Sequence, residues 1–325
     1  MAIDLIYNVG IFFMLMIPGI LLKKCKLSTD GLGKGLSNLV LYIAQPALIF
    51  LAYVRPYDSS VLKNIIWVFV FSIVAHLIFT AVTFASFKKA PDSARRMLRF
   101  ATIFSNAAFL GIPLIMEVIG PSAAIYASIY NITFNGFLWT LGVFICTNNR
   151  DVDGDGTDDA EKLKKKGGAS ITKAMLHPTM LAAALGLCFF FLPIDGYIPE
   201  FLTESLTKLQ NLVAPLSMIV LGLRLADIDL HGFFKDKQLY VFIALRHLIL
   251  PAATFAVMRV MQIFITIDSV VVESVLIMAS APAATSATMF AEKYDCDAAY
   301  VSKVVAVSTI LSLATMPLVS LLMNI

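Results

Sequence analysis

Apolar residues fill most of this chain in long, nearly continuous runs that short polar segments separate. A helix that crosses the hydrocarbon core of a bilayer needs about 20 apolar residues, and ten runs reach that length. They lie at 5–23, 34–54, 63–87, 97–119, 121–147, 171–193, 203–226, 238–262, 268–292 and 297–323. The pattern predicts an all-α integral membrane protein with ten transmembrane helices, and it leaves almost no chain for a soluble domain.

Two of these runs are related in sequence. Residues 70–85 and 241–256 are identical at nine of sixteen positions at one constant offset. Chance similarity in an apolar alphabet is one explanation, but duplicated membrane halves are typical of secondary transporters. Because five spans per half is an odd number, the second half must insert in the opposite orientation. The duplication therefore predicts two inverted five-helix repeats, residues 1–147 and 171–325, joined by a linker at 148–170.

Lysines and arginines are concentrated in alternate loops. They follow the first, third, fifth, seventh and ninth spans, for example at Lys23, Lys88, Arg150, Lys235 and Lys293. Short basic loops stay in the cytoplasm. We therefore expect a multi-pass protein of the plasma or inner cell membrane, with both termini outside and the linker 148–170 in the cytoplasm. No basic residue precedes the first span, which favours an anchor over a cleavable signal peptide.

Composition agrees with this class and argues against others. Hydrophobic residues make up 59% of the chain and charged residues 14%, which is unlike a soluble protein. The four cysteines have neither CxxC nor zinc-ligand spacing. The sequence contains no GxSxG, HExxH or paired intramembrane aspartates, so we expect no enzyme. We also expect no cofactor and no nucleic-acid partner, and membrane lipids as the surroundings.

Two of the runs carry helix-breaking and polar residues near mid-depth. The fourth contains Ser105, Asn106 and Pro113, and the ninth contains Pro282 within residues 280–288. A proline removes a backbone hydrogen bond, and small or hydroxyl residues let other groups satisfy the freed carbonyls. An ordinary kink is the alternative for one helix. A matched pair in a duplicated chain favours two broken helices, whose half-helix N-termini suit a carboxylate or similar anion.

Four segments carry a resemblance to a known family. They are FSNAAFLGIPLIMEVIGPSAAIYASIYNITFN, LHPTMLAAALGL, VLGLRLA and SAPAATSATMFAEKYDCDAAYVSKVVAVSTILSLATMP. In them the chain resembles the auxin efflux carrier family of membrane transporters, and the likeness extends over nearly the whole chain. The bacterial branch is more similar than the plant carriers. His177 and Pro178 stand where plant members have Asn-Pro-Asn, Ser105 and Asn106 stand where they have Pro-Asn, and the long plant cytosolic loop is missing.

The resemblance implies a ten-helix inverted-repeat fold, related to bile-acid sodium symporters, in which broken helices 4 and 9 cross at the substrate site. It also implies a dimerising scaffold of helices 1, 2, 6 and 7, and a transport domain of helices 3–5 and 8–10 that moves as an elevator. Bacterial relatives are associated with small organic acids such as malate or malonate. We therefore expect a carrier of mono- or dicarboxylates. An auxin-like indole carboxylate carrier, and a membrane sensor or channel with the same fold, are the alternatives.

Polar residues at mid-membrane are the candidates for substrate contact, because such groups are costly there unless they face a partner or a water-filled cavity. The candidates are Asn106, Ser105, Pro282, Thr285, Ser286, Asn131, Asn135, Gln45 and Lys303. Each has a structural alternative: hydroxyls can bond to their own helix, amides to a neighbouring helix, and Lys303 can extend to the interface. Asn106, Pro113 and Pro282 are the expected helix breakers.

Ionisable residues inside the spans leave the coupling ion open. Arg246 lies deep in the eighth span, with Glu273 and Glu117 as candidate partners. His76 and His247 occupy matching positions of the third and eighth spans; histidine titrates near neutral pH, but a neutral histidine bonded to a neighbouring helix is the commoner case. Proton coupling, sodium coupling and facilitated movement all fit the sequence. Unwound carbonyls near the breaks are the candidate sodium ligands.

The linker contains the residues closest to a metal-binding motif. Asp151, Asp153 and Asp155 approach the D-x-D-x-D-G spacing of a calcium loop. Lys162 stands where the bidentate glutamate is expected. A solvated linker, acidic and then basic, is the better interpretation, and its lysines can touch anionic lipid head groups.

Overall fold

The computed structural model describes residues 2–29, 31–147, 176–192, 198–231 and 233–322, and in these ranges its regular secondary structure is helical, apart from one isolated β-bridge. The first half contains α1 (Ala2–Lys24), α2 (Leu32–Leu39), η1 (Val40–Ala44), α3 (Gln45–Tyr53), α4 (Ser59–Ala85), α5 (Asp92–Ile103), η2 (Ala107–Gly111), α6 (Ile112–Val118), η3 (Pro121–Ala123), α7 (Ala124–Phe137), η4 (Leu138–Gly142) and α8 (Val143–Thr147). The second half contains α10 (Pro178–Phe191), α11 (Glu200–Gln210), α12 (Val213–Ala226), η6 (Phe233–Lys235), α13 (Lys237–Ala244), η7 (Leu245–Ile249), α14 (Leu250–Phe264), α15 (Ser269–Ser280), α16 (Ser286–Lys293) and α17 (Ala298–Leu322). The all-α prediction is confirmed for the described residues.

Seven continuous helical segments in the described part of the chain are long and apolar enough to cross a membrane. They are Ile6–Lys24, Leu32–Tyr53, Ser59–Ala85, Pro121–Thr147, Glu200–Ala226, Lys237–Phe264 and Ala298–Val319. Each coincides with a predicted span. The other three predicted spans correspond to shorter apolar helices, Ala107–Val118, Pro178–Phe191 and Ser269–Ser280. A multi-span helical membrane protein is thus supported, while the count of ten and the inverted repeat stay predictions.

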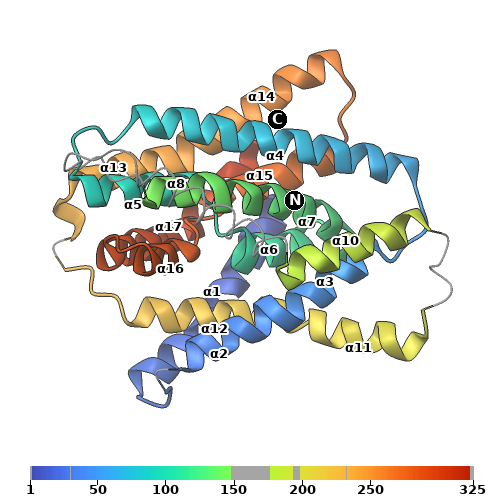
Figure 1. Cartoon of the computed structure of the whole chain (residues 1–325), viewed down its shortest axis with the longest axis horizontal. Coiled ribbons are helices and arrows are strands. Elements are labelled where there is room, and N and C mark those ends of the chain that lie inside the picture. Colours follow the sequence, from blue (N-terminus) through green and yellow to red (C-terminus); the bar gives the residue numbers. More distant parts are fainter. Residues whose placement is uncertain (1, 30, 148–175, 193–197, 232, 323–325) are drawn as a thin grey trace, which may run out of the picture.

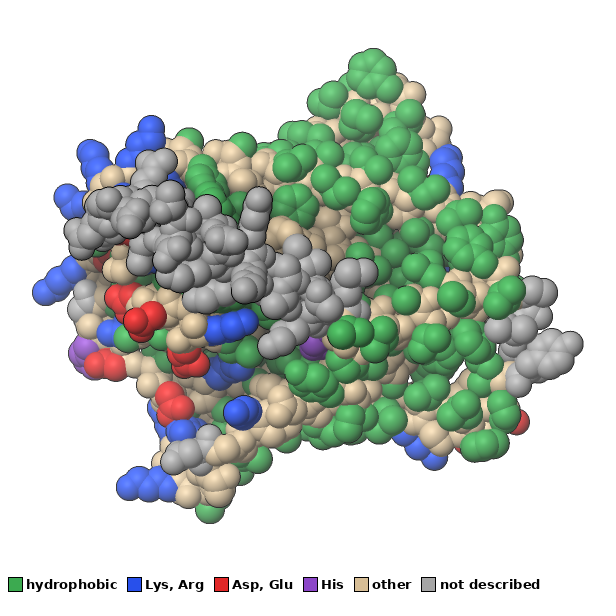
Figure 2. Space-filling model, in the orientation of Figure 1, with side chains coloured by type: hydrophobic (Ala, Val, Ile, Leu, Met, Phe, Trp, Pro, Cys, Tyr) green, Lys and Arg blue, Asp and Glu red, His purple; other side chains and the backbone are tan. Residues whose placement is uncertain are grey.

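The surface has the distribution of side chains that a bilayer requires. Figure 2 shows hydrophobic side chains over the middle of this face and charged side chains at its two ends. Large apolar residues such as Met14, Leu77 and Ile263 are exposed. Lipid tails solvate such side chains, whereas the backbone polar groups are satisfied inside each helix.

Two groups of helices pack mainly within themselves. In one, α1 packs on α12, and α3 packs on α10 and α11. In the other, α4 packs on α7, α14 and α15, and α17 packs on α16 and α5. Figure 1 shows α2, α11 and α12 along one side of the molecule and α4, α13 and α14 along the opposite side. Helix α1 also packs on α17 and so joins the two groups. The division into a scaffold and a transport domain therefore stays a prediction.

Glycine sets the spacing of α1 and α12. A Cβ atom on Gly19 would lie 2.2 Å from the carbonyl oxygen of Ile219, and one on Gly222 would lie 2.0 Å from the carbonyl oxygen of Met16. Small residues at a membrane helix interface let two backbones approach closely. These two glycines therefore fix the central helix pair of the first group.

Candidate functional site

Two helices are interrupted in the middle of the molecule, close to where the sequence predicts. Helix α5 ends at Ile103 and the next helical turn, η2, starts at Ala107. Helix α15 ends at Ser280 and α16 starts at Ser286. Asn106 and Pro282 lie in these interruptions as expected. Pro113 does not: it lies inside the helical segment Ala107–Val118, directly after the π-helical turn η2, which accommodates its missing N–H.

The two interruptions cross and bond to each other. Ser105 and Ala283 form an antiparallel bridge. The amide of Asn106 donates to the carbonyl of Pro282 over 2.7 Å, and the amide of Ala284 donates to the carbonyl of Phe104 over 2.9 Å. Non-helical backbone at membrane depth is tolerated only where its polar groups find partners. The crossing provides those partners between two segments that are distant in the chain.

Arg246, in the π-helical turn η7, binds the carbonyl ends of both broken helices. Its Nε donates to the carbonyl of Ala281 over 3.1 Å, and one terminal nitrogen donates to the same oxygen and to Ala279 over 3.0 Å. The other terminal nitrogen donates to the carbonyl of Thr102 over 3.1 Å. Helix C-termini carry partial negative charge, so a fully buried guanidinium is stabilised there.

These contacts correct the partners proposed for Arg246 from sequence. Its described hydrogen-bond partners are backbone carbonyls, and neither Glu273 nor Glu117 is among them. Five N–H donors in a planar fork let one arginine serve several carbonyls at once. The side chain also lies over the ring of Phe79, with 5.4 Å between the guanidinium carbon and the ring centre.

A cavity of about 170 Å³ lies beside the crossing and gathers most of the candidate residues. Seven of the nine line it: Gln45, Ser105, Asn106, Asn131, Asn135, Thr285 and Ser286. Pro282 is adjacent through its bond to Asn106. Lys303 does not line this cavity, and its ammonium lies 5.9 Å from the ring centre of Phe233.

Four buried polar atoms of the cavity wall have no hydrogen-bond partner within the described protein: Gln45 Oε1, Ser105 Oγ, Asn106 Nδ2 and Ser286 Oγ. Buried polar groups are normally paired, so these four atoms keep hydrogen-bonding capacity that the described protein does not use. Asn135 differs, because its Nδ2 donates to the carbonyl of Asn131 over 2.8 Å along its own helix. The polar residues of the cavity wall are thus of two kinds: those with an atom that lacks a hydrogen-bond partner, and those, such as Asn135, that bond to their own helix.

The remaining wall was not anticipated from the sequence. Phe134, Trp139 and Phe290 form an aromatic part, and His177 and Thr179 approach from the start of α10. His177 Nδ1 lies 2.8 Å from Thr179 Oγ1 and caps the helix by accepting from the Thr179 amide. An aromatic residue in an apolar span looks the same whether it faces lipid, core or cavity, so periodicity alone gives no signal for this wall.

The paired histidines are bonded within the protein. His76 Nδ1 lies 2.7 Å from the carbonyl of Ser72 one turn away. His247 bonds through both ring nitrogens, to Thr315 Oγ1 and to Ser308 Oγ, each over 2.9 Å. Ser308 Oγ also accepts from the amide of Ala283 over 2.8 Å. His247 therefore supports the crossing through Ser308, which is the structural alternative named from the sequence.

The predicted linker at 148–170, with the calcium-loop candidates Asp151, Asp153 and Asp155, lies outside the described residues. Within the described ranges, no group of three or more metal-ligating His, Cys, Asp or Glu side chains occurs.

Comparison with known proteins assigns the family. The sequence profile of the family described as membrane transport protein matches residues 5–320. An uncharacterized transporter of Methanocaldococcus jannaschii is 24% identical over 314 residues, which cover 95% of each chain. An uncharacterized transporter of Methanothermobacter thermautotrophicus is 25% identical over 311 residues, again 95% of each chain. The chain therefore belongs to the membrane transport protein family, the family of the auxin efflux carriers, whose members are membrane transporters and not enzymes.

Proposed function

We propose that the protein is a carrier of small organic anions, chiefly mono- or dicarboxylates such as malate or malonate, and that they bind in the cavity beside the crossing. The proposal rests on two buried atoms that lack a hydrogen-bond partner in the described protein, Asn106 Nδ2 and Ser286 Oγ. An amide N–H and a hydroxyl can each donate to a carboxylate oxygen. They lie at the starts of two helical segments that cross at one point.

The helix starts add to the preference for an anion. Neither η2 at Asn106 nor α16 at Thr285 has a side-chain cap, and the first amides of a helix have no partner within it. The positive end of each helix dipole is directed toward the same region. No lysine or arginine lines the cavity in the described part of the chain. We therefore propose recognition by neutral donors and helix dipoles.

Cavity size limits the substrate. Sites for drug-sized ligands measure about 300–1,000 Å³, whereas this cavity measures about 170 Å³. That volume favours a small acid. The aromatic wall of Phe134, Trp139 and Phe290 is the one observation that favours an indole carboxylate, which we keep as the second candidate substrate.

We propose an elevator movement as the mechanism, in which α4–α8 and α13–α17 slide past the scaffold. Gln45, His177 and Thr179 of the scaffold form one wall of the cavity, and the crossing forms the other. Four side-chain hydrogen bonds in the described part of the chain bridge the groups. Gln45 Nε2 donates to the carbonyl of Ala108, and a terminal nitrogen of Arg224 donates to the carbonyl of Thr285 over 3.3 Å. Asn8 Nδ2 donates to the carbonyl of Glu117 over 3.3 Å, and the Tyr53 hydroxyl lies 2.6 Å from Ser128 Oγ. Sliding requires these bonds to break and re-form.

We propose further that sodium does not bind at the crossing. Carbonyls freed by a helix break are the usual sodium ligands in such folds. Here Thr102, Ala279 and Ala281 accept from Arg246, and Phe104 and Pro282 accept from backbone amides. The guanidinium of Arg246 thus occupies carbonyls that would otherwise bind a sodium ion. Proton coupling and facilitated movement remain as the candidate modes of transport.

The membrane arrangement is also a proposal. We place the protein in the cell membrane, with the termini outside and the basic loops in the cytoplasm. We propose a homodimer through the scaffold, because α11 buries none of its residues and exposes Phe201. An apolar surface on the scaffold suits either lipid or a second copy, and cross-linking in native membranes decides between them.

Counterflow in proteoliposomes tests the proposal. Vesicles loaded with unlabelled malate, malonate or indole acetate accumulate the labelled acid transiently above its external concentration only if a carrier exchanges the two. We expect saturable uptake of a small acid, competed by its analogues. Linear, unsaturated flux indicates a channel instead, and no flux through folded, inserted protein favours a sensor.

A further inference from the structure

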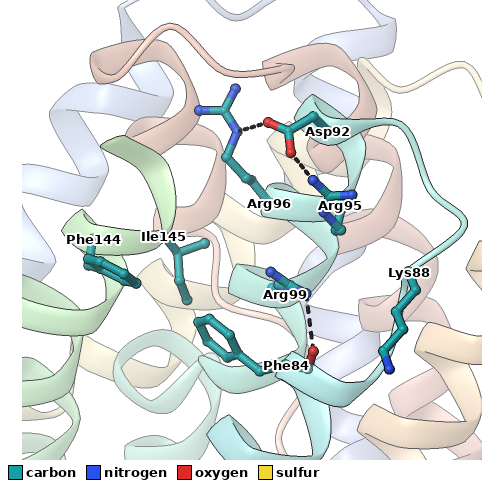
Figure 3. A pocket seen from close by; sticks show the side chains of 8 residues that line it. All are labelled: Phe84, Lys88, Asp92, Arg95, Arg96, Arg99, Phe144 and Ile145. Carbon is teal, nitrogen blue, oxygen red and sulfur yellow. Dashed lines mark hydrogen bonds and ion pairs between the residues drawn. The ribbon is translucent and has the colours of Figure 1, made fainter. Parts of the chain in front are cut away.

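A second cavity, of about 380 Å³, lies at the ends of α4, α5 and α8 and shares no lining residue with the cavity beside the crossing. Four basic residues, Lys88, Arg95, Arg96 and Arg99, line it together with one carboxylate, Asp92. Figure 3 shows the three arginines in succession along α5, with Lys88 beyond the end of α4. Among the described lining residues, four positive charges thus face one negative charge, and this lining attracts anions.

The protein itself positions these arginines. Asp92 pairs with Arg95, and its second oxygen lies 3.3 Å from Arg96 Nε. Arg96 also donates to the carbonyl of Cys146 over 2.8 Å. Arg99 donates to the carbonyl of Phe84 over 3.1 Å and lies over its ring. A guanidinium fixed in this way loses little entropy when it binds an anion, and its planar fork matches two phosphate oxygens.

Helix α5 adds to the attraction, because it begins at Asp92 beside these side chains. The positive end of its dipole therefore lies at the cavity. Helix starts and arginine forks together are a recurrent arrangement for phosphate groups.

The opposite wall is apolar and belongs to membrane-spanning helices. Phe84 lies near the end of α4, and Phe144 and Ile145 lie in α8. Phe144 is 47% exposed. The cavity thus lies where a basic end of the molecule meets its apolar band, which is the depth of a lipid head group. The acyl chains of a lipid can cover the exposed Phe144 ring beside the charges, whereas a small soluble phosphate ester has no apolar part that does so.

We propose that this cavity binds the phosphate of an anionic phospholipid, with the phosphate among the α5 arginines and Lys88 and the acyl chains along Phe144. Zwitterionic lipids carry the same phosphate together with a compensating ammonium group. We therefore expect the cavity to prefer lipids whose head group has a net negative charge. Because α5 runs from this site to the crossing at Phe104, a bound lipid is attached to a helix of the proposed moving group.

Native mass spectrometry of the full-length protein, purified with phosphatidylglycerol or phosphatidylcholine, tests the site. The test variant is Lys88→Gln with Arg95→Gln. The matched control is Lys235→Gln with Lys237→Gln, which removes the same charge from another basic loop outside this cavity. We expect the test variant to bind phosphatidylglycerol at least about tenfold more weakly, since each basic residue near a membrane surface contributes about 1 kcal/mol and 1.4 kcal/mol is tenfold. The control and the parent protein should bind it equally.

Four results would overturn the proposal. The first three are unchanged phosphatidylglycerol binding in the test variant, an equal loss in the control, and equal retention of phosphatidylcholine. The fourth is displacement of the lipid by millimolar glycerol phosphate, which would assign the site to soluble phosphate esters instead. If the double variant is unstable, Lys88→Glu gives the same test, because the Lys88 side chain is exposed and reversing its charge leaves the α5 contacts intact.

Discussion

The guanidinium of Arg246 is joined to the carbonyl oxygen of Ala281 by two hydrogen bonds, one from Nε and one from a terminal nitrogen. The same side chain reaches Ala279 and Thr102, so one buried cation binds the ends of α5 and α15 together. The geometry of the crossing therefore depends on a residue that does not line the cavity.

Replacement of Arg246 by methionine should destabilise the protein by about 3 kcal/mol or more, because several buried carbonyls lose a charged donor. Arg246→Lys should be intermediate, since one ammonium cannot serve carbonyls of both helices. Thermal unfolding in detergent measures both. Melting temperatures equal to that of the parent protein would show that the guanidinium does not hold the crossing.

Sodium should have no direct effect on transport, because the carbonyls of the crossing are already occupied by Arg246 and backbone amides. Initial uptake rates in sodium and in choline media, at matched pH and osmolarity, should agree within about twofold. A steep, saturable dependence on sodium concentration would contradict this assignment.

Alanine at Gly19 should destabilise the α1–α12 pair, because its Cβ would meet the Ile219 carbonyl at 2.2 Å. Overpacking of this kind costs about 1–3 kcal/mol. Gly10→Ala is the matched control, since the same helix has nothing within 4 Å of a Cβ at that position. Melting temperatures of the two variants should differ, and equal values would remove the close-contact argument.

Asp58 caps α4, and the sign of its pH dependence follows from its pKa. The Ser60 hydroxyl and amide donate to its carboxylate over 2.7 and 2.8 Å, which holds the pKa of Asp58 below its ordinary value. The cap therefore stabilises the helix start above the unfolded-state pKa of about 3.9 and is lost as the pH falls through the lower folded-state pKa.

Hydrogen exchange at the first turn of α4, corrected for the intrinsic rate, should show this loss as faster opening at low pH. Asp58→Asn retains a capping oxygen but cannot ionise, so its opening should lack the step. The same step in both proteins would assign it to another group.

Much of the fold could be predicted because its signals are local in sequence. Runs of apolar residues mark the spans, and Asn106 and Pro282 mark the interruptions. The depth of Arg246 was evident too, but its partners were not, because backbone carbonyls have no sequence signature. Pro113 was misassigned as a breaker since a π-helical turn can absorb a proline without an interruption.

The site was partly predictable for the same reason. Polarity inside a span selected Asn106, Ser286 and Gln45, which share one cavity. The same criterion included Lys303, which does not line the cavity, because sequence does not tell which side of a helix faces the cavity. In the sequence analysis the basic residues after each span serve only to predict topology. Arg95 and Arg99 are four residues apart and thus on one helix face, which is a signal for a shared site.

We propose that the side-chain amide of Asn106, whose Nδ2 has no partner among the described residues, binds the transported anion. Counterflow of labelled malate and malonate, measured for Asn106→Ala and for the control Thr140→Val, tests this role. Thr140 is exposed and bonds to the Gly136 carbonyl of its own helix over 2.7 Å. Melting temperature and size-exclusion profile establish that both variants are folded.

We expect Thr140→Val to transport like the parent protein. Asn106→Ala should stay folded and lose at least about tenfold in rate at low substrate concentration, as expected for loss of a donor to a charged group. Parent-like counterflow by folded Asn106→Ala would show that this side chain does not bind the anion.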